Sequence, residues 1–285
     1  MESGDPPSNW NTYSGSVLDS VADERPGGGG LNCIDTLYGA STLHGYSDLI
    51  TLDSYGLYFL RGWIKRAAGT SIITLGAGIS TTSPNRFSSG GVANSTWVEY
   101  GGIMTPVVQS GCYVQLFHYG GASGDKMRAD DVSIRGLSMY QLVSQILDTG
   151  ESNVIASVKY TNTTRVGDGG VVVGLDSKYT PQSYRVAFYT SGRNSVFLFD
   201  SVSGTWTQKV GASTSYLNGK TLLLVSSGTV SRVYYNDVFI GTQQTMAPNT
   251  NTSHGIFATH PNAFLQDFTV FSCGLGGEYS ELDEF

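Results

Sequence analysis

Charge is scarce in this chain of 285 residues, since only 14% of them are Asp, Glu, Lys or Arg. Basic residues are the scarcer kind, with 16 against 23 acidic ones, and the formal net charge is -7. The longest basic run is the pair Lys65-Arg66. Proteins that bind nucleic acid usually present a basic face, so the sequence predicts no nucleic-acid partner.

Long hydrophobic runs are also missing. No apolar segment approaches the roughly 18–20 residues that span a bilayer, so membrane insertion is not expected. The first seven residues are acidic and polar, which predicts that no secretory signal peptide is present.

The chain has few metal-ligating and thiol groups. Its three cysteines, Cys33, Cys112 and Cys273, lie far apart and form no Cys-x-x-Cys pair, so we expect buried free thiols. The four histidines have no metal-ligand spacing. His118 alternates with Val114 and Leu116, which favours a hydrogen-bonded histidine on the core side of a strand.

Sequence patterns of catalytic residues are absent as well. A glycosidase needs two carboxyl groups facing each other across a sugar, but between Glu24 and Glu278 the only glutamates are Glu99 and Glu151. No Gly-x-Ser-x-Gly segment marks a hydrolase nucleophile. We therefore predict that the protein is not an enzyme.

What is present is a series of short apolar runs with alternation, separated by Gly, Ser, Asn and Thr. β-Branched and aromatic residues crowd these runs, a pattern typical of antiparallel sandwiches and barrels. Clear examples are 55–66, 111–119, 153–160, 184–189, 194–200 and 231–240. Asn218-Gly219 and Asn236-Asp237 are typical of hairpin turns.

One segment breaks this pattern. Met139, Leu142, Val143, Ile146 and Leu147 have the spacing of one helix face, although a strand remains an alternative. We interpret 139–152 as a linker, with a short helix as one possibility. The linker joins a domain at 1–138 to a domain at 153–275, and an acidic tail follows at 276–285.

The first domain resembles carbohydrate-binding modules of the family 4/9 type. The resemblance is carried by four segments in order: the opening at 2–10, Tyr58 to Ala67, Thr96-Trp97-Val98-Glu99-Tyr100, and Asp130-Asp131-Val132-Ser133-Ile134. The second domain resembles concanavalin A-like lectin/glucanase domains of the laminin-G sort. There the matches are Val171 to Leu175, Ser183 to Val186, Thr221 to Val225, Arg232 to Gly241, and the ending at His254 and Asp267.

Both families are β-sandwiches, so the resemblance implies an all-β chain of two tandem jelly rolls. It also implies non-catalytic glycan binding. Tandem sandwiches of this kind without an export signal are met in phage tail, neck and capsid-decoration proteins. We therefore expect a virion-surface protein, extracellular by particle assembly, that contacts cell-surface or environmental polysaccharide and other virion proteins or copies of itself.

Aromatic and polar side chains that share a strand face are the candidates for the sugar site. Arg61 and Trp63 alternate with the apolar residues of one run, and Tyr113 and Gln115 alternate with those of another. The predicted platform of the first domain combines these four residues. In the second domain the candidates are Tyr189 and Trp206. In each case, packing against a second sheet or a subunit is the alternative.

A structural calcium ion is the cofactor that the first resemblance implies. Its ligands would be Glu2 with Asp130 or Asp131, because Ca²⁺ takes carboxylate and carbonyl oxygens. Two other functions remain open: a purely structural virion or filament protein whose aromatic faces pack against other subunits, and a binding-module fragment of a glycoside hydrolase.

Overall fold

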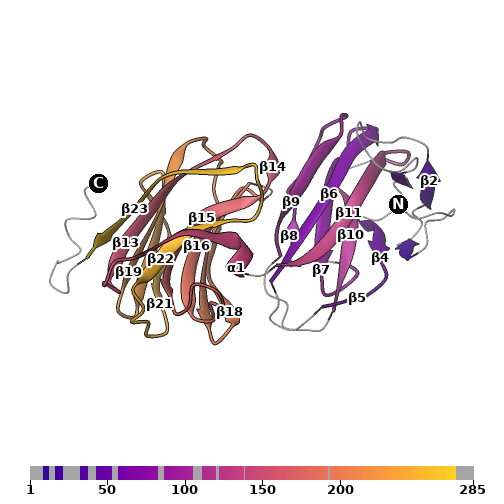
Figure 1. Ribbon diagram of the computed structural model, residues 1–285. Coiled ribbons are helices and arrows are strands. Elements are labelled where there is room, and N and C mark those ends of the chain that lie inside the picture. The colour runs from indigo at the N-terminus through magenta and orange to yellow at the C-terminus, as the bar shows by residue number, and fades with distance from the viewer. Residues whose placement is uncertain are drawn as a thin grey trace. The chain divides into compact units, whose positions relative to one another are not determined.

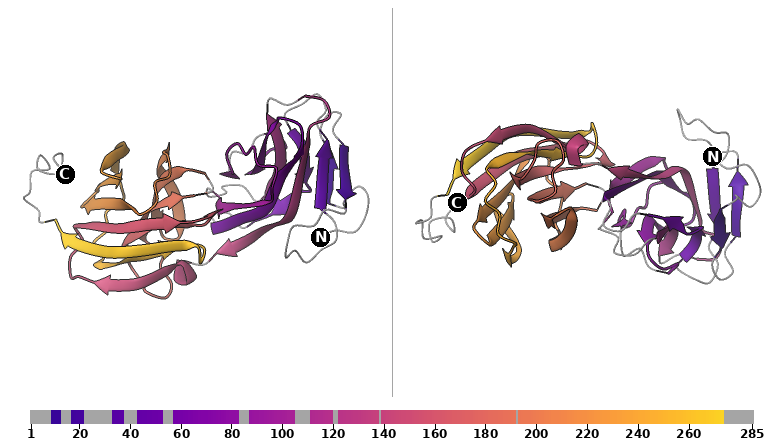
Figure 2. Two further views of the ribbon diagram at one scale, coloured as in Figure 1. Left: turned by 90° about the horizontal axis from the view of Figure 1, so that it is seen from above. Right: turned by 60° about the horizontal axis from the view of Figure 1, so that its bottom comes forward.

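The computed structural model describes residues 9–12, 17–21, 33–37, 43–52, 57–82, 87–104, 111–119, 122–137, 139–191 and 193–273. The chain divides into two compact units, Met1–Gly136 and Leu137–Phe285 (Figure 1). Each unit is built of antiparallel strands in layers (Figure 2). The fold class predicted from the sequence, all-β with jelly-roll sandwiches, is confirmed.

The first unit has two sheets. One has the order β1 (Trp10–Thr12), β4 (Leu43–Ser47), β10 (Gly111–Tyr119), β7 (Ile72–Gly78) and β8 (Phe87–Ser88), and β5 (Ile50–Thr51) also pairs with β10. The other includes, in order, β9 (Val98–Ile103), β6 (Leu57–Ala68), β11 (Lys126–Leu137), β3 (Cys33–Leu37) and β2 (Val17–Val21).

The core of the first unit lies between these sheets. Leu60 and Ile64 of β6 meet Leu75 of β7 and Leu116 of β10 in one buried cluster. The alternation along β6 is therefore as predicted, with every second side chain in the core. Burial of such side chains is the main favourable contribution to folding.

The second unit also has two sheets. One has the order β12 (Val143–Asp148), β22 (Ser253–Ala258), β15 (Asp168–Leu175), β16 (Tyr184–Thr190), β17 (Ser195–Val202) and β18 (Thr205–Ser213). The other has the order β21 (Val238–Thr245), β20 (Val230–Tyr235), β19 (Lys220–Ser227), β13 (Val154–Asn162) and β23 (Ala263–Ser272). The two-residue strand β14 (Arg165–Val166) lies between β13 and β15 in the sequence.

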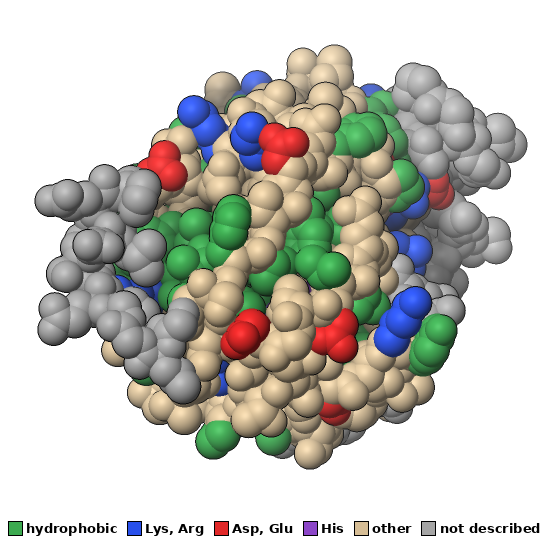
Figure 3. Space-filling view, turned by 60° about the vertical axis from the view of Figure 1, so that its left-hand side comes forward, with side chains coloured by type: hydrophobic (Ala, Val, Ile, Leu, Met, Phe, Trp, Pro, Cys, Tyr) green, Lys and Arg blue, Asp and Glu red, His purple; other side chains and the backbone are tan. Residues whose placement is uncertain are grey.

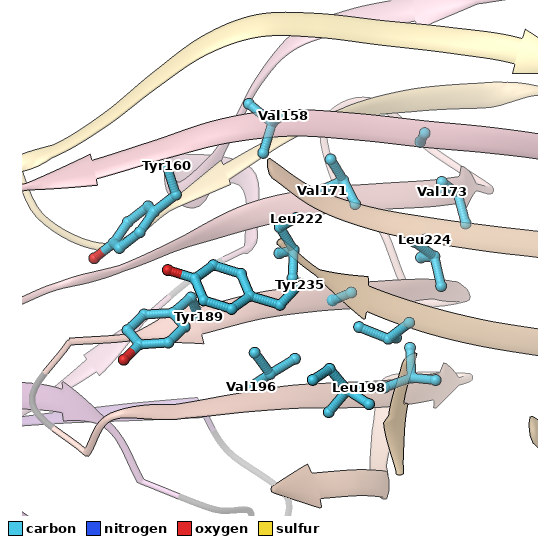
Figure 4. Packing of buried hydrophobic residues seen from close by; sticks show 14 of the residues in the cluster. Val158, Tyr160, Val171, Val173, Tyr189, Val196, Leu198, Leu222, Leu224 and Tyr235 are labelled. Atoms are coloured by element: carbon cyan, nitrogen blue, oxygen red, sulfur yellow. The ribbon is translucent and has the colours of Figure 1, made fainter. Parts of the chain in front are cut away.

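Aliphatic side chains and three tyrosine rings fill the second core (Figure 4). The rings of Tyr189 and Tyr235 stack with centroids 4.9 Å apart, and Tyr160 lies 5.6 Å from Tyr189. Their hydroxyl groups remain hydrogen-bonded, for example from Tyr160 to the Gly167 carbonyl oxygen at 3.1 Å. Bonded hydroxyls avoid the cost of a buried unpaired polar group.

The segment interpreted as a linker contains both conformations considered for it. Met139–Leu142 forms one helical turn, α1, and Val143–Asp148 forms strand β12, which pairs with β22. Residues 143–148 thus belong to a sheet of the second unit. Within the described residues, no helix is long and apolar enough to cross a membrane.

Two smaller predictions can be compared with the structure. Asn236 and Asp237 have φ values of 51° and 63° between the paired residues Tyr235 and Val238, so this two-residue hairpin turn is present. Cys112 is a buried free thiol, as predicted, whereas Cys273 is only partly buried. The side chain of Cys33 lies outside the described residues.

Candidate functional site

The outer face of β6 carries two of the predicted site residues. Leu60 and Ile64 point into the core, so Arg61, Trp63 and Lys65 point away from it. These three alternate residues form a row along the outer face of β6. Gly62, on the inward side, is close to Leu75 and Val132, and an added Cβ atom there would lie 3.0 Å from each.

Strand β9 adds a carboxylate beside these side chains. Trp63 is paired with Glu99, and the Arg61 Nε atom lies 2.6 Å from Glu99 Oε1. Tyr100 is buried in the core and Val98 packs against it, which directs Trp97 and Glu99 outward. Trp97 and Glu99 are not among the site residues predicted from the sequence, although the alternation around Tyr100 indicates that both point outward.

Arg61, Trp63, Lys65, Trp97 and Glu99 together form what we call the tryptophan face. The Lys65 Nζ atom lies 4.8 Å from the centroid of the Trp97 ring, a cation–π contact. The backbone bond from Arg66 N to Asn94 O, at 2.7 Å, holds the Trp97 segment against β6. The face combines indole rings with charged donors and an acceptor, which is suited to a ligand with both C–H surfaces and hydroxyl groups.

Arg61 is the more exposed member of the ion pair on this face. Its side chain is 43% exposed, whereas that of Glu99 is 14% exposed. The carboxylate therefore fixes the guanidinium group from below and leaves its outer N–H groups to solvent. Guanidinium groups have five donors in a planar fork, so an arginine bound on one side can still donate to a ligand on the other.

Tyr113 and Gln115 do not join this face, which corrects the predicted four-residue platform. Both lie on β10, in the sheet that contains β4 and β7. Gln115 is fully buried and donates from Nε2 to the Ser80 carbonyl oxygen. Tyr113 meets Tyr46 edge to face, with centroids 5.9 Å apart. The two sheets of a sandwich turn their outer faces in opposite directions, so one ligand cannot contact all four residues.

Tyr189 is a core residue and is not available to a ligand. Its side chain is fully buried, and its hydroxyl donates to the Thr214 carbonyl oxygen at 3.1 Å. Burial raises the pKa of Tyr189 well above its ordinary value. The prediction that this ring stacks on a sugar is therefore wrong.

Trp206 is also buried, with only 6% of its surface exposed. Its ring lies 5.0 Å from Phe199 and 6.0 Å from Tyr184, and its Nε1–H donates to the Tyr184 hydroxyl. Burial raises the pKa of Tyr184 to about 12. Trp206 thus belongs to an aromatic layer on the side of its sheet opposite the core, and in this position it cannot stack on a sugar.

The predicted calcium ligands are only partly described. Asp130 is buried; its Oδ1 atom accepts a hydrogen bond from Asp131 N at 2.7 Å, and its Oδ2 atom has no hydrogen-bond partner among the described residues. A buried carboxylate oxygen of this kind fits a Ca²⁺ ligand. Glu2 lies outside the described residues, within which no group of three or more His, Cys, Asp or Glu side chains could hold a metal ion.

His118 is a buried, hydrogen-bonded histidine, as its alternation with Val114 and Leu116 predicted. The ring is fully buried, and its two nitrogens lie 2.9 Å from the hydroxyl oxygens of Thr36 and Ser71. A buried imidazole with both nitrogens bonded joins β10 to β3 and to the start of β7. It has no exposed edge for a substrate.

Comparisons with known proteins give only distant matches. No family model matches the chain, and no curated protein does. Among solved structures, the tandem CBM22-1–CBM22-2 domains of Paenibacillus barcinonensis Xyn10C are 10% identical, with 93% of this chain and 94% of that chain covered and a TM-score of 0.35.

Single domains match about half of the chain. The carbohydrate-binding module CBM66 from Bacillus subtilis is 16% identical over 46% of this chain and 80% of that chain, with a TM-score of 0.36. The galectin LEC-6 of Caenorhabditis elegans is 12% identical over 46% of this chain and 94% of that chain, with a TM-score of 0.35. At this level of similarity, the ligands of these proteins cannot be assigned to this protein.

Proposed function

We propose that the protein binds glycans without cleaving them and that the tryptophan face is the binding surface. The observation that carries this proposal is the pairing of two indole rings, Trp63 and Trp97, with the exposed Arg61 and with Lys65 on one sheet face. Flat aromatic rings contact the C–H faces of sugars, and charged donors bond to their hydroxyl groups.

One pair of outward-facing carboxylates, Asp35 and Glu99, is too widely spaced for hydrolysis. Asp35 on β3 also points outward, since its neighbour Ile34 is in the core, and it is held by Lys126 Nζ at 3.2 Å and Arg128 Nε at 3.0 Å. Three strand intervals separate β3 from β9, which places Asp35 roughly 14 Å from Glu99 across the sheet. A glycosidase requires its two carboxyl groups within roughly 5–9.5 Å, so this pair does not meet the requirement.

The proposal extends to display in many copies, as on a phage-like particle. A shallow sheet face with few donors binds one glycan weakly, and linked copies raise the effective concentration of the second and later contacts. Support for the particle setting comes from the sequence resemblance alone. Identification of neighbouring genes for terminase, portal or tail proteins is the observation that tests it.

A glycan array probed with the multimerised protein tests the binding proposal. We expect Trp63→Ala to weaken binding about tenfold per site, since a lost aromatic contact is worth about 1.5 kcal/mol. Arg61→Gln removes an exposed charge and also leaves the mostly buried Glu99 carboxylate without its cation. A thermal melt should first show that this variant is folded, and we then expect it to bind the same glycans more weakly. Tyr119→Ala is the control, because this ring is 39% exposed but lies on β10, in the other sheet.

Two outcomes would contradict the proposal. One is the absence of binding to every glycan by a multimer whose melting temperature shows that it is folded. The other is equal binding by the Trp63, Arg61 and Tyr119 variants. A stable oligomer that is indifferent to sugars would instead favour the structural role in a particle or filament.

A further inference from the structure

The outer face of one sheet in the second unit is apolar at its centre. The strands of this sheet lie in the order β21, β20, β19, β13 and β23. Figure 3 turns this side of the molecule forward and shows hydrophobic side chains gathered in the middle of the face. On the two edge strands, Phe271 is 62% exposed and Phe239 is 42% exposed. A contiguous apolar surface of this kind is typical of an interaction site.

The residues between these two rings also point outward. Ile155 of β13, Leu223 of β19 and Tyr234 of β20 each lie between two residues of the core cluster, and side chains alternate along a strand. All three are only partly buried. Tyr234 is paired with Phe239, and their ring centroids are 5.2 Å apart. We call these outward side chains the apolar face: Phe271, Ile155, Leu223, Tyr234 and Phe239.

The strand register makes the apolar face continuous from edge to edge of the sheet. Phe271 is paired with Ile155, and Ile155 with Val225. Val225 lies two residues from Leu223, so the two side chains are on the same side of β19. Leu223 is paired with Tyr234, which leads to the ring on β21. Each of the five strands thus contributes to one surface.

The charged side chains that flank the apolar face have partners within the chain. Lys159 Nζ lies 2.7 Å from Asp267 Oδ2, and Arg232 Nε donates to Gln243 Oε1 at 2.8 Å. Groups that are already paired do not select a partner of opposite charge. The whole chain has a net charge of -7, so two copies repel one another in general. A face whose acid is paired with its own lysine is one on which two copies can meet.

The area of the sheet fits a second copy as the occupant. Five strands about 4.8 Å apart, with about seven residues on each, give an outer face on the order of 500 Å². Two such faces bury about 1,000 Å² together, which is the lower limit for a specific interface. A contact between two copies needs one self-complementary patch. An apolar patch whose flanking charges are paired meets that requirement.

We propose that two copies of the protein associate through their apolar faces, sheet against sheet, as a reversible dimer with a two-fold axis. The small area predicts a dissociation constant in the micromolar range. Leu223 is on the central strand and therefore lies near the middle of the interface, with Phe271 and Phe239 toward its two sides. This inference is independent of glycan binding, which we assign to the first unit.

Sedimentation equilibrium of the full chain, from well below to well above micromolar concentrations, tests the proposal. We expect a monomer at the low end and a dimer at the high end. Phe271→Ser removes a ring from both copies at once, because the interface is symmetric. With about tenfold lost for each ring, the dissociation constant of the dimer should rise about 100-fold. Phe239→Ser should have a similar effect.

Tyr179→Ser is the matched control. The Tyr179 ring is 62% exposed, as is that of Phe271, but it lies between β15 and β16 of the other sheet. This variant should therefore dimerise as strongly as the native protein. Leu223→Asp places two carboxylates near each other in the middle of the interface and should abolish the dimer. A thermal melt should show that each variant is folded, which we expect because the replaced side chains are on the outer face or in a loop.

Three results would overturn the proposal. A chain that stays monomeric at every concentration would leave the apolar face to a different protein. A dimer of unchanged strength in Phe271→Ser, Phe239→Ser and Leu223→Asp would show that another surface joins the copies. Growth beyond the dimer as concentration rises would show a contact that no two-fold axis closes. Failure of glycan binding would change none of these outcomes, since that function is tested by substitutions in the first unit.

Discussion

At the scale of single residues, a glycine in β15 illustrates how tightly the sandwich of the second unit is packed. Gly170 is paired with Phe188 of β16. A Cβ atom added at Gly170 would lie 2.6 Å from the Phe188 Cα atom and closer still to the Ala187 carbonyl oxygen. These are backbone atoms of the neighbouring strand, so they cannot move aside without breaking the ladder.

We therefore predict that Gly170→Ala destabilises the second unit by about 3 kcal/mol, as expected for overpacking against backbone. Gly150→Ala is the control, because its φ of 72° disfavours a side chain but no atom lies within 4 Å of the added Cβ, and it should cost only about 1 kcal/mol. Urea unfolding of the two variants measures the difference. Equal losses would mean that β16 moves aside to admit the methyl group.

The correct and wrong site predictions also have a physical explanation at this scale. Along β6, apolar and polar residues alternate, so the sequence alone placed Arg61 and Trp63 outside the core. Along β16, by contrast, both faces are apolar: Ala187 and Tyr189 point into the core, and Phe188 packs with the rings of Phe197 and Phe199 on the opposite side. Alternation cannot distinguish an exposed face from a buried one when both are hydrophobic.

At the scale of elements, the sequence predicted where strands occur better than it predicted which strands pair with one another. The run at 111–119 is strand β10, and its inward residues Val114 and Leu116 follow the predicted alternation. Its place beside β4 and β7, away from β6, depends on pairing between strands that are distant in sequence. No local pattern encodes that pairing, and so Tyr113 and Gln115 were wrongly combined with Arg61 and Trp63.

The loop after β12 contains a pH-sensitive contact with β22. The Gly174 N–H group donates to His254 Nδ1 at 3.3 Å, so the ring proton is on Nε2, which lies 2.9 Å from the Glu151 carbonyl oxygen. Burial lowers the pKa of His254 below its ordinary value of 6.5, although Asp148 nearby acts in the opposite direction. Protonation at Nδ1 would place a second donor against the Gly174 N–H group.

From this contact we predict that the second unit loses stability as pH falls below about 6.5. The unfolded chain takes up a proton at this pH while folded His254 resists it, so stability is complete above 6.5 and decreases as pH falls toward the folded pKa. Urea midpoints measured between pH 8 and pH 5 should fall in the native protein and fall less in His254→Gln.

His260→Gln is the matched control for this experiment, since it removes a histidine from the same unit, and it should keep the pH dependence of the native protein. If the urea midpoint falls equally with pH in His254→Gln and in the native protein, groups other than His254 cause the loss of stability. Asp148 titrates in a separate, lower range, because its hydrogen bonds from Thr252 and Gly150 lower the pKa of its carboxyl group below 3.8.

At the scale of the whole molecule, each of the two core clusters draws its members from one unit. One cluster contains Leu60, Leu75 and Leu116, and the other contains Val158, Leu222 and Leu224. A core that is complete within one unit can melt without the other. The binding surface that we propose on the first unit should therefore respond to substitutions in the core of that unit and not to those in the core of the second.

We predict two separable unfolding transitions in calorimetry of the full chain. Leu60→Ala and Leu222→Ala each remove a fully buried side chain, which costs about 2–5 kcal/mol, or roughly 10 °C in the midpoint of one transition. Each variant should shift a different transition and leave the other within about 1–2 °C, because distant sites act additively. A joint shift of both transitions in either variant would show that the units unfold as one cooperative body, and glycan binding would then have to be tested only in variants whose second unit is intact.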